Sequence, residues 1–554
     1  MTDVLTLNVE GVEGVSAAVM TALQRDRRRP RDLERHLRAV CKGGEELEGA
    51  DGWAVANNIV SVVAGQLPLI VGGCNGLVLF SALRHLSPSL WLSAPLTHEA
   101  CRGVAETTVH RSADWSTIPD EGDCWSFPPR IIEVLADLSA ASMMLVTALS
   151  ARRRIAKGQR VSVRRLVPLE FRRAQGAIAD LIEVRDTRVM NDRNALAGVS
   201  GLSVVAGEHN HRVLAAEWVS PKEFHPVHGP AASAERGEVA PLPGDVARQG
   251  FRADLDDRDD QLTVVNDALE TTLRFGFAAL DVVYEAVTAK IIQTYPVGCR
   301  SMADHGWALG PTPTATELRA AARVVARRGK PRPSPESVRR AFDAVDAGQA
   351  DNDVTKWRHQ RAFRRIGDSI LYDLVKSSPL PLHLIESDLP HWVAQTLETG
   401  FEPRVHGLIG QLGTQPFRTG EVLRRQDGSL ITDLDACVAV GKVLFVADCY
   451  ASPWRQDLDD GDHASTRNRA ERLVKKLRAW DGKWKEVKRT APNLLPAGVS
   501  LILPVVVTPG AEWIGSTDGD LWFSPGIPRI CTATELMDLI HRGVDADTPG
   551  VIDV

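Results

Sequence analysis

The stretch SLITDLDACVAVGKVLFVADCYAS, residues 429–452, decides the fold that we expect for the C-terminal part of the chain. Two apolar runs flank Gly441 and Lys442, and a two-residue loop that begins with glycine favours a type II′ turn between antiparallel strands. The stretch therefore predicts a β-hairpin in which Val440 and Val443 are paired across the turn.

This register brings acidic side chains together. Asp435 falls opposite Asp448, and Asp433 falls opposite Tyr450 on the same face. Directly opposed residues have Cβ atoms about 4.5–5.5 Å apart, so two carboxylates repel each other unless a cation or a proton compensates. Mg²⁺ suits such a site, because it binds one or two carboxylates together with phosphate and water. The opposite face is suited to a core and carries Leu434, Ala436, Val438, Val440, Val443, Phe445, Ala447 and Cys449.

The elements around the hairpin follow a definite order. Residues 388–413 predict two helices with a short break, and three strands follow, one before the hairpin and two that form it. A helix capped by Ser465 and Thr466 comes next, and then a β-branched strand. The segments are TQPFRTGEVLRR (414–425), SLITDLDACVAV (429–440), KVLFVADCYAS (442–452), ASTRNRAERLVKKLRAWDGKW (464–484) and VSLILPVVVTP (499–509).

From Ile385 to Pro509, less than a quarter of the chain, this order resembles the PD-(D/E)xK, or restriction-endonuclease-like, nuclease superfamily. In that family one acidic residue lies on a central strand and a (D/E)xK tripeptide on the next, and a further acid often lies on the preceding helix. The resemblance implies that Glu402, Asp435 and Asp448 hold Mg²⁺ or Mn²⁺, which activates water for attack on a phosphodiester.

Tyr450 stands where the family has its lysine. A phenol carries no positive charge near neutral pH, so it cannot replace that cation. One interpretation is that a lysine reaches the site from elsewhere. Lys475 and Lys476 lie on the next helix, whereas Lys442 lies too far along the hairpin; the catalytic set would then be Asp435, Asp448, Tyr450 and Lys475. The other interpretation is a degenerate site that binds nucleic acid or a protein without cutting.

The rest of the chain predicts an α+β, multidomain protein with a largely helical N-terminal portion. We expect a helical domain over 1–200, a β-hairpin and Pro/Gly-rich linker over 201–255, a second helical domain over 256–384, and the nuclease-like α/β domain over 385–554. Amphipathic helices are expected within 30–43, 128–158, 169–189, 261–292, 314–329, 334–348 and 355–377.

The last of these predicted helices, TKWRHQRAFRRIGDSILYDLVKS (355–377), is strongly basic. Beside a nuclease-like domain such a stripe is a candidate for contact with DNA phosphates through Arg361, Arg364 and Arg365. A solvated helix face is the alternative.

Composition sets broader limits. The 554 residues carry a net charge of −6, which excludes a uniformly basic nucleic-acid binder but not a local basic groove. Residues 54–83 contain no charge, but polar residues, a proline and glycines interrupt them, so we expect a buried pair of elements broken near Gly72 and Gly73 instead of a membrane span.

The cysteines are scattered without a CxxC pair, which is typical of reduced thiols in a cytoplasmic protein. Abundant Arg, Ala and Asp with scarce Lys and Tyr indicate a GC-rich bacterial genome. We therefore expect a cytoplasmic, metal-dependent nuclease-like protein acting on DNA, with an N-terminal portion that regulates it or binds a protein partner. By analogy, we expect the protein to act in prokaryotic defence or in DNA processing.

Overall fold

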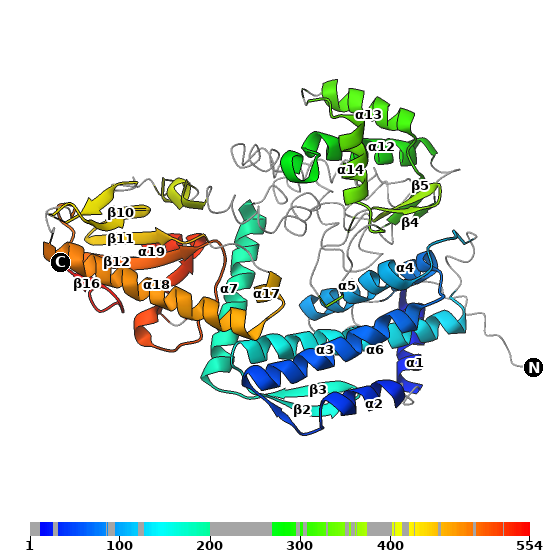
Figure 1. The fold of residues 1–554 in the computed structure, drawn as a ribbon, viewed down its shortest axis with the longest axis horizontal. Coiled ribbons are helices and arrows are strands. Elements are labelled where there is room, and N and C mark those ends of the chain that lie inside the picture. Colours follow the sequence, from blue (N-terminus) through cyan, green and yellow to red (C-terminus); the bar gives the residue numbers. More distant parts are fainter. Residues whose placement is uncertain are drawn as a thin grey trace, which may run out of the picture.

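The computed structural model is a mixed helix and sheet protein with three parts (Figure 1). We call them the N-terminal part (12–199), the middle part (269–373) and the C-terminal part (401–554). The structure describes residues 12–25, 31–84, 86, 95–119, 127–199, 269–294, 300–302, 307–327, 329, 331–348, 354–355, 361, 363–373, 401–403, 405–410, 412, 420–425, 427–451, 456–490, 495–524 and 526–554. The hairpin and linker predicted over 201–255 lie outside these residues.

Helices dominate the N-terminal part, as predicted. The long helices α3 and α6 lie side by side, because apolar residues such as Ile59, Val63 and Leu67 recur at helical spacing along α3 and are buried against α6 (Figure 1). The helices are α1 (Val12–Arg25), α2 (Arg31–Val40), α3 (Gly49–Val71), α4 (Gly76–Arg84), α5 (Pro95–Ser112), α6 (Pro129–Ala156) and α7 (Ala177–Val199).

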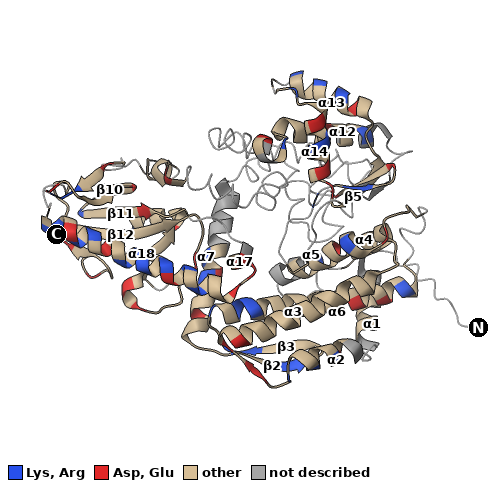
Figure 2. Ribbon diagram, in the orientation of Figure 1, with Lys and Arg blue, Asp and Glu red and all other residues tan. Residues whose placement is uncertain are grey.

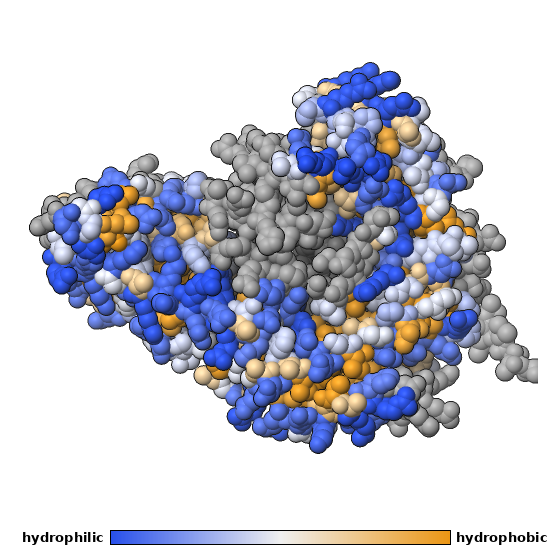
Figure 3. Space-filling model, in the orientation of Figure 1, coloured by the Kyte–Doolittle hydropathy of each residue, from blue (hydrophilic) through white to orange (hydrophobic). Residues whose placement is uncertain are grey.

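The charge-free stretch forms two helices with a break at Gly72 and Gly73, which confirms the prediction. Gly73 has a φ of 74°, a backbone conformation that glycine adopts without strain. By length and composition alone, α3 and α6 could each cross a membrane, although core helices pass the same test. Hydrophobic side chains gather over these two helices in Figure 3.

A small antiparallel sheet covers one end of these helices. Its order is β1-β2-β3, from β1 (Glu46–Leu47), β2 (Val161–Leu166) and β3 (Leu169–Arg173). The helix predicted over 169–189 is thus partly wrong: residues 169–173 pair with β2, and the helix begins only at Ala177.

The middle part packs α12 against a four-stranded sheet of order β4-β5-β7-β6, and α13 and α14 pack against α12. Its elements are α12 (Phe277–Thr294), β4 (Arg300–Met302), β5 (Trp307–Pro311), α13 (Ala315–Arg327), α14 (Pro335–Ala344), β6 (Phe363–Ile366) and β7 (Ser369–Asp373), after a turn of π-helix at Leu269–Leu273. The helices predicted over 314–329 and 334–348 are confirmed.

The basic helix predicted over 355–377 is wrong. Its described residues include the hairpin β6–β7, which turns at Gly367 with a φ of 57°. The aromatic rings of Phe363 and Tyr372 lie 4.7 Å apart, and Tyr284 of α12 packs on Phe363. Burial of these rings outweighs the helical spacing of the arginines.

A five-stranded sheet organises the C-terminal part. Its order is β10-β11-β12-β15, with β16 beside one end of β12; β10 is antiparallel to β11, whereas β11, β12 and β15 are parallel. The strands are β10 (Ala436–Val440), β11 (Val443–Cys449), β12 (Leu501–Thr508), β15 (Ile530–Thr532) and β16 (Ile552–Asp553). Two separate two-stranded sheets pair β8 (Val422–Arg424) with β9 (Leu430–Asp433), and β13 (Trp522–Ser524) with β14 (Ile527–Pro528).

Helices cover both faces of this sheet. On one face lies α18 (His463–Thr490), whose Trp480 and Trp484 are buried against Leu444 and Val446. The other face is covered by helical residues 401–403 and 405–410 and by α19 (Ala533–Arg542). The predicted cap of α18 is wrong by a few residues, since Asp462 Oδ1 accepts from the backbone N–H of Ser465.

The start of α18 rests on the N-terminal part. The indole N–H of Trp53 donates to Gly461 O over 2.7 Å, and Arg152 donates to Asp460 O over 2.6 Å. At Gly461, which has a φ of 71°, an added Cβ would lie 2.6 Å from Arg153 Cγ. Only glycine fits at this close approach. The short helix α17 (Gln456–Asp459) lies just before it in the chain.

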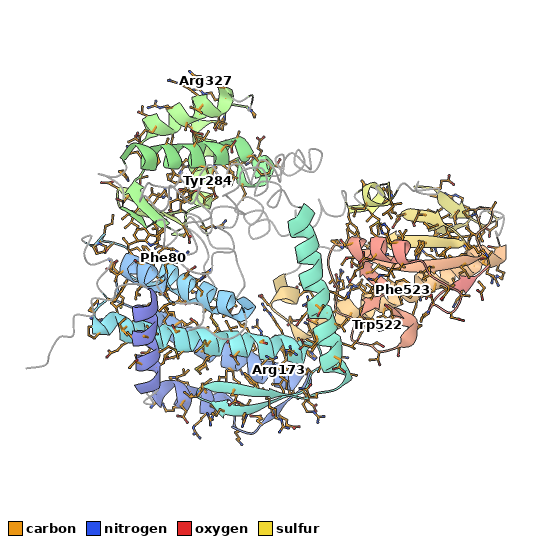
Figure 4. The ribbon with its side chains drawn as sticks, turned by 180° about the vertical axis from the view of Figure 1, so that it is seen from behind. Phe80, Arg173, Tyr284, Arg327, Trp522 and Phe523 are labelled. Atoms are coloured by element: carbon orange, nitrogen blue, oxygen red, sulfur yellow. The ribbon has the colours of Figure 1, made fainter. Side chains whose placement is uncertain are left out.

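A second contact joins α7 to the C-terminal sheet, and the two lie side by side in Figures 1 and 4. The Arg188 guanidinium is 2.6 Å from Glu535 Oε1 and also donates to Ile530 O and Glu512 O. Trp513 packs against Ile182 beside this ion pair.

The described cysteines are unpaired, in line with the reduced thiols that we predicted. Cys41, Cys74, Cys101, Cys437 and Cys531 are buried, and Cys449 is half-buried. Burial raises the pKa of the Cys41 and Cys101 thiols to about 12, so these thiols are protonated and unreactive at neutral pH.

Candidate metal and phosphodiester site

The hairpin β10–β11 has the predicted register. Val440 pairs with Val443 and Ala436 with Ala447, and Gly441 in the turn has a φ of 59°. Asp435 immediately precedes β10, so the same register continued by one residue aligns it with Asp448. The sequence pattern around one glycine was enough to predict this pairing.

Asp433 does not take part in the hairpin. It ends β9 and pairs with Val422 of β8, so the prediction that it lies opposite Tyr450 is wrong. The reason lies at Leu434, where the chain bends and the side chain is buried with Cys437 and the α18 tryptophans, not on the face of Ala436 as predicted.

Asp435 is a carboxylate in an unfavourable position. Its Oδ2 accepts from the backbone N–H of Cys449 over 2.8 Å. The pKa of Asp435 is raised to about 7, chiefly because burial disfavours its charge; the Cys449 N–H lowers the pKa in part, and the negative charges of Asp448, Glu402 and Asp433 add to the rise. A group with these surroundings binds either a proton or a cation.

Asp448 has a cationic partner that comes from α18. Lys476 Nζ lies 2.8 Å from Asp448 Oδ2, and it also lies 4.7 Å from the centre of the Tyr450 ring. Arg469 stacks on the same ring at 5.1 Å. The Tyr450 ring therefore lies against the lysine of α18 that is paired with Asp448.

The lysine in our predicted catalytic set was Lys475, but it is its neighbour Lys476 that lies beside Asp448. Consecutive residues point about 100° apart around a helix, so Lys475 is exposed while Lys476 faces Asp448. The sequence contained a signal for this choice. Leu473, Leu477 and Trp480 mark the buried face of α18, and Lys476 lies at the edge of that face.

Glu402 lies near the pair but is not gathered with it. Its Oε1 is 3.7 Å from His406 Nε2, and that imidazole donates to the backbone oxygen of Asp435 over 2.6 Å. Within the part of the chain that the structure describes, no group of three or more His, Cys, Asp or Glu side chains is placed to hold a metal ion. Asp435 and Asp448 are thus a two-carboxylate site with Glu402 at its margin.

The residues present can still accommodate a divalent cation. Asp435 and Asp448 each use one oxygen, for the Cys449 N–H and for Lys476, and their second oxygens make no hydrogen bond within the described residues. Mg²⁺ commonly takes one or two protein carboxylates and completes its shell with phosphate and water.

The predicted phosphate contacts lie elsewhere and are engaged with protein. Arg364 donates to His110 O over 2.8 Å and stacks on Trp115 at 4.4 Å. Arg365 binds the carboxylates of Asp343 and Asp346, each over 2.7 Å.

The third of these predicted contacts, Arg361, lies near Tyr284. Burial raises the pKa of that phenol, and the positive charge of Arg361 lowers it in part. Arg365 thus makes contacts within the middle part, and Arg364 joins the middle part to α5.

No protein-family model, curated protein or solved structure matches this chain.

Proposed function

We propose that the C-terminal part is a restriction-endonuclease-like domain that hydrolyses phosphodiester bonds of DNA with the help of Mg²⁺ or Mn²⁺. The observation that carries the proposal is the meeting of Asp435, Asp448 and Lys476 at one end of the central strands. Two acids and an ammonium group are what the PD-(D/E)xK chemistry requires, and the tripeptide alone supplies only an acid.

Each residue has a distinct role in this proposal. Asp435 and Asp448 would bind the cation through their second oxygens, and Glu402 would reach it through water. The cation supplies a water of lowered pKa and stabilises charge on the phosphate. Lys476 orients the attacking water and stabilises the developing negative charge. Tyr450 keeps the Lys476 ammonium beside Asp448 through its ring face.

The test is cleavage of linear, circular and single-stranded DNA by the purified full chain, with and without Mg²⁺ or Mn²⁺. We expect metal-dependent cleavage that Asp448→Ala abolishes and that Lys476→Gln lowers about a hundredfold or more. Lys442→Gln is the matched control, because this exposed lysine lies at the turn, at the other end of β11, and should leave the rate unchanged.

One observation favours a second function. The Lys476–Asp448 ion pair already neutralises one of the two carboxylates, so the site is stable without metal if Asp435 keeps its proton. The domain would then be a catalytically silent scaffold that binds nucleic acid or protein. Wild type and Asp448→Ala giving equal results with every DNA and metal would establish this scaffold and end the hydrolytic proposal.

A further inference from the structure

The long helix α18 carries an unusual amount of positive charge on its solvent face. The helix has 28 residues and is about 42 Å long, and basic residues far outnumber acidic ones along it (Figure 2). Its apolar side is buried against the sheet. On the exposed side lies what we call the α18 stripe: Arg467, Arg472, Lys475, Arg478, Lys485 and Arg489.

Part of the stripe is offset by nearby acids. Arg467 pairs with Glu471 over 3.5 Å and Arg478 with Asp518 over 3.1 Å, and both pairs are exposed on both sides. Among the described residues the other four basic side chains form no ion pair within 4 Å, although Lys485 lies near Asp481 and Arg489 near Glu486; these four are Arg472, Lys475, Lys485 and Arg489. A sustained positive potential on one rigid helix attracts a polyanion.

We infer that the α18 stripe is the surface on which the backbone of duplex DNA lies, independently of base sequence. The inference rests on the proposed function only in taking DNA as the ligand. From Arg467 to Arg489 the stripe is about 33 Å long, close to one turn of B-DNA at about 34–36 Å. It also adjoins the candidate site, since Lys475 of the stripe precedes Lys476 beside Asp448.

The chemistry of α18 argues against other partners. Single-stranded nucleic acid needs aromatic faces on which bases stack, but Trp480 and Trp484 are 2% exposed. A lipid surface needs an apolar face to insert, and that of α18 is covered by the sheet. A protein interface needs apolar or aromatic anchors, and the stripe has none. Phosphate contacts by arginine and lysine remain.

The experiment measures binding apart from cleavage. In full-length protein carrying Asp448→Ala, the triple variant Arg472→Gln, Lys475→Gln, Lys485→Gln is titrated into labelled duplexes of two unrelated sequences at about 50–200 mM salt. The matched control is Arg319→Gln, Arg323→Gln, Arg327→Gln, which removes equal charge from the exposed face of α13. Figure 4 places Arg327 far from the C-terminal sheet.

We expect the stripe variant to bind both duplexes about tenfold or more weakly, with a salt slope smaller by about 2–3, and the control variant to match the parent within about twofold. Equal losses in the two variants, no loss in the stripe variant, or a stripe-dependent affinity for phosphatidylserine vesicles without one for duplex DNA would each overturn the inference. Stripe-dependent binding without cleavage by wild type would leave it standing while ending the hydrolytic proposal.

Discussion

Asp435 makes the folded protein sensitive to pH. Its pKa is about 7 in the folded chain against 3.8 as its ordinary value, so between these values the folded state holds a proton that the unfolded state has lost. Stability therefore falls as pH rises through this window. The loss is complete only above about pH 7.

Replacing this carboxyl should remove that sensitivity. Asp435→Asn keeps an oxygen for the Cys449 N–H but has no charge to bury. We expect the variant to melt several degrees above wild type at about pH 8, with the gap narrowing as the pH falls and closing only near the ordinary value of 3.8. Thermal unfolding of both proteins across this range measures the gap, and a gap that does not change with pH would contradict the assignment.

A divalent cation should offset the same repulsion. At about pH 8, Mg²⁺ at ten times its dissociation constant should stabilise wild type by about 1.4 kcal/mol. Asp435→Asn and Asp448→Ala should gain nothing beyond the effect of NaCl at equal ionic strength. The same thermal melts, with and without the metal, detect the shift even if no DNA is cut, and equal gains in all three proteins would exclude a metal at this pair.

Among the elements, the hairpin depends on one backbone conformation. Gly441 has a φ of 59°, and an added Cβ would meet nothing within 4 Å, so a substitution there is limited by backbone strain alone. We expect Gly441→Ala to lower the free energy of unfolding by about 1–3 kcal/mol. Gly441→Asn should lower it less, because asparagine tolerates this conformation. Urea unfolding compares them, and equal losses would point to another cause.

The sequence was informative where short-range rules govern. The register of β10–β11 follows from Gly441 and the apolar runs, and α6 and α18 follow from their helical sequence patterns. Two regions escaped these rules: residues 169–173, which form β3, and the hairpin β6–β7. The spacing of arginines suggested a helix where Phe363 and Tyr372 instead form a hairpin buried by α12.

The candidate site was predicted only in part. Asp435 and Asp448 could be placed together from the register, because both belong to one hairpin. Lys476 could not be chosen over Lys475 from the motif, since the choice depends on which side of α18 meets the sheet. Glu402 depends on how a separate helix packs, which local sequence does not encode.

At the scale of the whole molecule, Arg188 holds the C-terminal part to α7. Its side chain is 5% exposed and binds Glu535 as well as two carbonyl oxygens. Arg188→Ala leaves Glu535 without its guanidinium partner, and breaking a buried pair in this way costs about 3–5 kcal/mol. We expect calorimetry to show an earlier, separate transition for the C-terminal part. Arg185→Ala, on the same helix with its Asp186 pair more exposed, is the control and should not shift it.

The anchoring of α18 has a consequence for control of the site. Just before its first residue, the chain accepts hydrogen bonds from Trp53 and Arg152 of the N-terminal part. Farther along, α18 carries Lys476. Asp435 and Asp448, in contrast, belong to the strands. Because the apolar face of α18 is buried against the sheet, the ammonium keeps its distance from the carboxylates only while this packing holds. The hydrogen bonds of Trp53 and Arg152 at the start of α18 therefore link the place of this ammonium to the N-terminal helices, whereas the place of the carboxylates depends on the strands.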